Sequence, residues 1–190
     1  LFGSGDFTDV AGSGLGIDFV GNWAGESGGP ALRSELVMHR LESASYVTSG
    51  TFLFEPITGT YETTQDVAWF GIGPAWDFDR PGGRAELYVL AARGDVSATG
   101  SGVRINVAGE DPEGGAMWFA VAGASFEARP ASGGPGIAFG AELVRGGHAT
   151  VWDSPPVTAV EGGWVQRTRG TTVSGFALRA GLVFHRIPRR

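Results

Sequence analysis

The sequence lacks cysteine and lysine, and all 14 of its basic residues are arginine. Without cysteine there is no disulfide scaffold, no thiolate metal site and no cysteine nucleophile. The lack of lysine favours a chain whose outside does not mostly face water, although a GC-rich genome would produce the same bias. No run approaches the roughly 20 apolar residues that a membrane-spanning helix requires, which excludes that class of protein.

The balance of charge is acidic, with a formal net charge of −6 and a pI near 5.0. No basic stripe is present to neutralise phosphates, so nucleic acid is excluded as a partner, and the one basic cluster is the C-terminal tail, 185–190. The length fits a single domain, 1–190. No basic segment leads into an apolar one after Leu1, so any secretion signal has been removed or was never present. If the chain is the outer-membrane protein that its pattern predicts, we expect it to be exported with its signal peptide removed.

Alternation with a period of two residues recurs over segments of about ten residues, the length of a tilted strand that crosses a bilayer. In the last such segment every second residue from Phe176 to Phe184 is apolar, and the intervening positions are mostly small or charged. Two segments are apolar on both faces, Val67 to Phe78 and Met117 to Phe126, so the pattern assigns no face there. It predicts strands near 14–24, 31–43, 66–79, 84–98, 114–128, 135–150 and 171–185.

The links between these strands alternate between short and long. The short links, rich in glycine, proline or serine as tight turns require, are 25–30, 80–83 and 129–134. The long links are 44–65, 99–113 and 151–170. Short turns at one end and long loops at the other are typical of outer-membrane barrels, which have an even number of strands, so we expect an eighth strand in Leu1–Val10. The predicted fold is all-β, a closed antiparallel up-and-down β-barrel of about eight strands and of transmembrane type.

Two segments resemble a known family. Trp69-Phe-Gly-Ile-Gly-Pro-Ala-Trp76 is similar to the Gly-x-Gly-Pro-Ala-aromatic strand of the small OmpX and opacity-type, porin-like outer-membrane barrels. The last strand resembles their terminal strand, which the barrel-assembly machinery reads through alternating apolar residues and a final aromatic; here these are Phe176, Leu178, Leu182 and Phe184. The chain departs from that pattern by continuing past Phe184, which weakens the inference of recognition by the machinery.

Charged residues share the less apolar face of their strands. In a membrane barrel they would all point into the lumen, which in an eight-stranded barrel is just wide enough for side chains to fill. Buried charges must be paired, so we expect a structural polar network that plugs the lumen, and we expect Glu142 and Arg179 of adjacent strands to touch. A catalytic acid pair is the alternative. The expected members of the network are Asp18, Arg33, Glu35, Glu86, Glu142 and Arg179.

Other motifs give weaker signals. The glycines of Gly71-x-Gly73 lack the following helix of a phosphate loop, and close strand packing explains them better. His148 near Asp153 and Ser154 is the only candidate for a hydrolytic site. The six tryptophans would form interfacial girdles in a bilayer or line a pocket in a soluble carrier. We therefore predict no catalytic residue, no cofactor and no metal site.

The sequence leads to one principal hypothesis and three alternatives. The principal one is a non-enzymatic protein of the Gram-negative outer membrane, with a plugged lumen and long extracellular loops that act in surface structure, adhesion or ligand contact. Its expected partners are outer-membrane lipid and the barrel-assembly machinery. The alternatives are a self-assembling subunit of a surface array or filament, whose contacts between copies would order the long links, a soluble lipocalin-like carrier, and a lipid-directed hydrolase built on His148.

Overall fold

The computed structural model describes residues 2–3, 13–24, 28–41, 44–52, 55–102, 107–108, 115–130, 134–160 and 163–184. These residues contain no helix, and so none that is long and apolar enough to span a membrane. They form ten strands: β1 (Phe2–Gly3), β2 (Gly14–Ala24), β3 (Gly29–Leu41), β4 (Ala44–Phe52), β5 (Glu55–Arg80), β6 (Gly83–Gly102), β7 (Val107–Ala108), β8 (Gly115–Ala128), β9 (Gly136–Val160) and β10 (Gly163–Val183).

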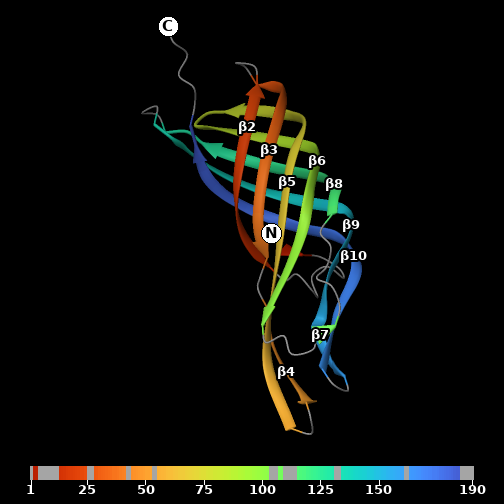
Figure 1. Cartoon of the computed structure of the whole chain (residues 1–190). Coiled ribbons are helices and arrows are strands. Elements are labelled where there is room, and N and C mark those ends of the chain that lie inside the picture. Colours follow the sequence, from red (N-terminus) through yellow and green to blue (C-terminus); the bar gives the residue numbers. More distant parts are fainter. Residues whose placement is uncertain are drawn as a thin grey trace.

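All ten strands belong to one strongly curled sheet with the shape of a half-barrel (Figure 1). The order along the sheet is β1-β10-β9-β8-β6-β5-β3-β2, with β4 paired to β5 and β7 paired to β10. The main pairings are antiparallel, and only the two-residue pairing of β7 with β10 is parallel. The prediction of an all-β, antiparallel fold is confirmed.

Seven of these strands overlap the seven predicted segments, but β5 begins 11 residues before the predicted start, β9 ends 10 residues after the predicted end and β10 begins 8 residues early. Two of the additional strands, β1 and β7, have only two residues. In the N-terminal segment expected to form the eighth strand, Phe2 and Gly3 pair with β10, and residues 4–12 lie outside the described part. The turn between β5 and β6 consists of Pro81 and Gly82, whose φ of 80° suits glycine. The described parts of the short links thus join adjacent antiparallel strands, as predicted.

The prediction of three long loops is wrong, because most of their described residues are strand. Within 44–65, β4 and the first part of β5 form a hairpin that pairs Ala44 with Thr63 and Phe52 with Glu55. Within 151–170, the outer parts of β9 and β10 pair with each other, from Thr168 opposite Trp152 to Gly163 opposite Val160. Both faces of these segments carry polar residues, so apolar alternation fails there, while threonine and valine still favour extended backbone.

These strand segments project beyond the curled part of the sheet (Figure 1). We call them the extension: β4, residues 55–66 of β5, 95–102 of β6, 146–160 of β9 and 163–174 of β10. The extension has a small core of its own, made of Tyr61, Ala98, Trp152 and Val157. The edge of the Tyr61 ring meets Trp152 at 5.7 Å between centroids, and the Trp152 indole donates a hydrogen bond to the carbonyl of Thr99. Segments distant in the sequence therefore hold each other in place.

Candidate functional site

The concave face of the sheet carries an ion-paired cluster, which we call the inner network. At its centre Arg179 of β10 contacts three carboxylates: Asp18 of β2 at 3.1 Å, Glu142 of β9 at 2.5 Å, and Glu35 of β3. Arg33 of β3 pairs with Glu86 of β6 at 3.1 Å and lies 3.6 Å from Glu35. All six residues singled out in the sequence meet here, and the expected contact of Glu142 with Arg179 is present.

Three further residues contact members of the inner network directly, and one of them, Asn22, also accepts a hydrogen bond from Arg84, which pairs with the buried Asp77. Tyr88 of β6 donates a hydrogen bond to Glu142, and the guanidinium of Arg33 lies over its ring, 3.9 Å from the centroid. His39 lies 2.8 Å from Asp18 through Nε2, and Asn22 donates to Glu86. Sequence reasoning missed these three residues because it followed formal charge alone. The parity of their strands was the signal available, since each shares the face of an expected member.

A glycine makes room for this cluster. A Cβ atom at Gly123 of β8 would lie 2.5 Å from the Tyr88 ring and 2.8 Å from Cγ of Glu142, closer than side chains pack. Only a residue without a side chain leaves space there for the tyrosine and the carboxylate to meet. At Gly73, likewise, a Cβ atom would collide with the backbone of Val89 and Leu90. The interpretation of Gly73 as a close-packing residue is therefore confirmed.

The charges of the inner network are arranged for structure. Its carboxylates, Asp18, Glu35, Glu86 and Glu142, all contact Arg33 or Arg179. Glu35 is fully buried, and Glu86 and Glu142 are nearly so. Buried carboxylates need cationic partners, whereas a catalytic acid needs access to a substrate. The geometry thus supports a structural cluster over an acid pair.

Apolar side chains fill the interior next to the inner network. Trp69 packs against Phe119 at 5.4 Å between ring centroids and against the His39 ring at 5.8 Å. Aliphatic residues surround them, among them Val37, Leu41, Val67, Leu90, Val121 and Val151. The concave side is therefore occupied first by the inner network and then by the apolar layer beside it. The core of the extension fills the interior beyond that layer.

The convex face differs from the concave face in its charge. Its outward side chains are uncharged over a continuous region, which we call the outer band. On β5, for example, the outward residues from Ala68 to Phe78 are all uncharged. Many of these side chains are large and well exposed, such as Ile17 at 62%, Leu143 at 69% and Leu178 at 66%. The outer band comprises the outward residues of 15–23, 30–38, 68–78, 85–91, 116–128, 137–143 and 176–184.

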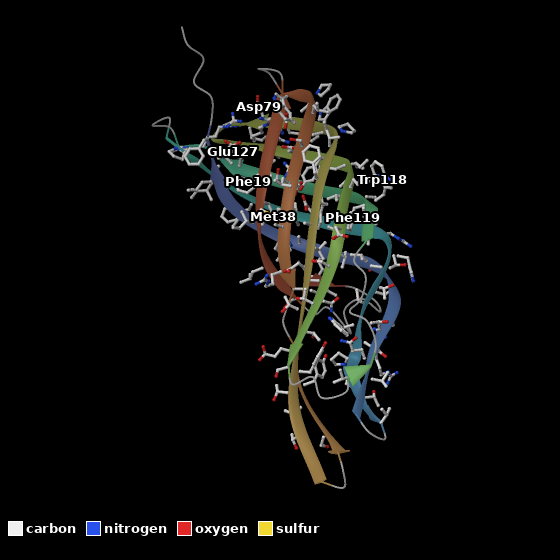
Figure 2. All side chains as sticks on the ribbon, viewed as in Figure 1. Phe19, Met38, Asp79, Trp118, Phe119 and Glu127 are labelled. Carbon is white, nitrogen blue, oxygen red and sulfur yellow. The ribbon has the colours of Figure 1, made fainter. Side chains whose placement is uncertain are left out.

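Three tryptophans face outward near the margins of the outer band. Trp23 and Trp76 lie towards the short turns, and Trp118 lies at the end of β8 nearer the extension (Figure 2). Trp69 and Trp152 are buried instead. The girdle interpretation therefore fits three of the five tryptophans whose side chains the structure describes. The four residues of the expected assembly signal, Phe176, Leu178, Leu182 and Phe184, all point outward in the band, and the tail 185–190 lies outside the described residues.

The hydrolase candidate gains no support from the geometry. His148 is exposed on β9 opposite Thr172 of β10, with its imidazole against Gly170. The carboxylate of Asp153 binds Arg167 at 3.1 Å and lies 4.0 Å from Arg169. Within the described ranges no group of histidine and acidic residues has the arrangement of a metal site.

Comparison of the chain with models of known families, with curated proteins and with solved structures finds no match.

Proposed function

We propose that the chain is a β-barrel protein of the outer membrane, filled rather than conducting, whose extension acts outside the bilayer in surface structure, adhesion or ligand contact. The observation that carries this proposal is the inverted polarity of the sheet, with buried ion pairs on the concave face and an uncharged outer band on the convex face. A protein surrounded by water would bury the apolar face and expose the charged one. The resemblance to small outer-membrane barrels is consistent with the same assignment.

The height of the outer band fits a bilayer. On β5 it runs from Ala68 to Phe78, and the ten steps between these residues, at roughly 3.3 Å each, span about 33 Å along the strand. For the strand tilt of about 40° usual in membrane barrels, this corresponds to a height of about 25 Å, the height of the apolar band of such barrels. Charged pairs such as Arg40 with Asp66 lie just beyond its margin on the extension side.

The margin of the outer band also shifts along the strands as a flat bilayer requires. On β5 the outward charge at the margin is Asp66. On β9 it is Arg145, which pairs with Ala120, and the same row continues through Ala91 to Ile72 of β5. Projected onto β5 along these rows, the margin on β9 is level with residue 72, whereas the margin on β5 itself is at residue 66. The strands of a barrel are tilted, so rows of paired residues are slanted relative to a plane perpendicular to the barrel axis. A margin that lies in such a plane therefore crosses from one row to the next, as it does here.

Closure of the sheet between β2 and β10 is part of the proposal. An open edge leaves backbone N–H and C=O groups unpaired, which lipid does not tolerate. The contact of Arg179 on β10 with Asp18 on β2, at 3.1 Å, supports closure because it brings together side chains from opposite lateral sides of the curled sheet.

The experiment that tests the membrane assignment is fractionation followed by gel electrophoresis with and without boiling. A folded membrane barrel should remain with the membrane fraction, resist cold detergent and change its mobility on heating. Recovery of the folded protein in the aqueous fraction, as expected for a soluble carrier, would overturn the proposal.

A separate measurement tests the filled interior. Recordings from planar bilayers containing the purified protein should show no large, stable, ohmic conductance, because the inner network and the apolar layer beside it occupy the concave side. A conductance of that kind would contradict the filled interior while leaving the membrane assignment intact.

The filament alternative loses its main argument, since the long links pair within the chain.

A further inference from the structure

Two arginines on the convex face stand apart from the others. Arg93 of β6 and Arg145 of β9 are exposed, and within the described residues neither has a carboxylate partner. Most other arginines at strand positions of the described ranges are paired, including the exposed Arg40 and Arg167, whereas Arg80 at the turn end of β5 has no carboxylate partner among the described residues. Two unpaired guanidinium groups on the strands on either side of β8 indicate a partner from outside the chain.

The two arginines flank an exposed tryptophan. Arg93 lies directly opposite Trp118 of β8 and over its ring, 5.7 Å from the centroid. Arg145 lies opposite Ala120, two positions along β8 from Trp118 on the same face. Asp95 shares the face of Arg93 but lies further into the extension, and no ion pair joins the two within the described residues. Across β6, β8 and β9 the arrangement is a cation, an aromatic ring and a second cation.

This group lies at the margin of the outer band. On the side of the short turns the outward neighbours are uncharged, Ala91 on β6 and Leu143 on β9, and on the other side the extension begins. Figure 2 shows Trp118 on the outer side of the curled sheet. In a bilayer this is the level of the lipid headgroups, where tryptophan and arginine are both favoured.

We propose that Arg93, Trp118 and Arg145 form a binding site for the phosphate headgroup of an anionic lipid, whose acyl chains lie along the outer band below. Guanidinium groups bind phosphate through paired hydrogen bonds, and the indole packs against the upper part of the lipid. A lipid is favoured over a free phosphate because the site is continuous with the apolar surface. This proposal rests on the membrane assignment made above.

The test uses the full chain reconstituted in phosphatidylcholine vesicles that contain brominated phosphatidylcholine or brominated phosphatidic acid. Bromine quenches tryptophan, and the difference between the wild type and Trp118→Phe isolates the signal of Trp118. We expect phosphatidic acid to be enriched beside Trp118 by about 5-fold for each arginine. The double variant Arg93→Gln/Arg145→Gln should lose this preference, and Arg93→Lys/Arg145→Lys should keep most of it.

The matched control is Arg80→Gln, which removes an exposed arginine from the turn end of β5, at the opposite margin of the band. Its preference should equal that of the wild type. A preference that persists in the glutamine double variant, or is absent from the wild type, would overturn the site. So would a loss of preference when excess inorganic phosphate is added, because the site would then take free phosphate. Failure of the membrane assignment looks different, since brominated phosphatidylcholine would then quench no tryptophan at all.

Discussion

The curled part of the sheet and the extension are built from the same long strands yet present opposite outer surfaces. On β5 the outward residues of the extension are Thr60, Glu62, Thr64 and Asp66, and after Ala68 they are uncharged up to Phe78. Backbone pairing with β6 continues across the change. The two regions therefore differ in the residues that face outward rather than in their backbone pairing. Substitutions at matched positions of the two regions test this difference.

The largest effect is expected from Arg179→Ala. Its side chain is 11% exposed and contacts Asp18, Glu35 and Glu142, so its loss leaves three carboxylates without their common cation. Breaking a buried ion pair in this way costs about 3–5 kcal/mol. Arg167→Ala in the extension, where the side chain is 51% exposed, should cost about 1 kcal/mol or less. Urea unfolding in vesicles, followed by tryptophan fluorescence, measures both, and equal losses would contradict a structural role for the inner network.

The outer surface is compared by placing arginine on both parts of β5. Ile72→Arg puts a charge near the middle of the outer band, where lipid-facing arginine costs about 2–4 kcal/mol. Thr60→Arg changes an outward position of the extension and should alter stability by about 0.5 kcal/mol or less. The free energies of unfolding in vesicles give the comparison. If the two variants lose the same stability, lipid does not surround the band.

Two glycines of the concave face, one in the packed interior and one near the end of β10, offer a comparison of intermediate size. Gly123→Ala adds a methyl group against Tyr88 and Glu142 and should cost about 1–3 kcal/mol through overpacking. At Gly181, which shares the side of Arg179 near the end of β10, an added Cβ meets no atom within 4 Å, so Gly181→Ala should be close to neutral. Unfolding of both variants under one set of conditions checks this, and an equal response would show that the concave side is loosely packed around Glu142.

The curled part of the sheet was predictable because each strand there meets two different surroundings. In 176–184 every second residue is apolar and the intervening ones are mostly small or charged, and parity alone placed Arg179 on the face opposite Leu178. Parity also placed Glu142 and Arg179 on the same face of two strands that were predicted to be adjacent, and the structure joins them there. In Val67 to Phe78 both faces are apolar, so only the structure distinguishes the buried Trp69 from the exposed Trp76.

The extension was missed for the opposite reason. Its strands carry polar residues on both faces, so no apolar period marks them, and segments such as 55–65 resembled loops. Their ordering depends on contacts between residues far apart in the sequence, such as the hydrogen bond that Gln166 donates to the Tyr61 hydroxyl at 3.1 Å. Parity cannot predict such contacts, because they depend on how β5 and β10 approach each other beyond the curled part.

The smallest expected effect tests whether the extension behaves as a separate unit of stability. Tyr61→Phe keeps the ring contact with Trp152 but removes the oxygen that Gln166 binds, a change worth about 0.5–1.5 kcal/mol. Because the hydrogen bond joins two segments of the extension, its loss should appear as faster amide exchange in 55–66 and 163–174, with exchange in the curled part unchanged. Exchange that accelerates equally throughout β5 would instead mean that the two regions unfold together. The long strands would then transmit stability from the inner network to the extension.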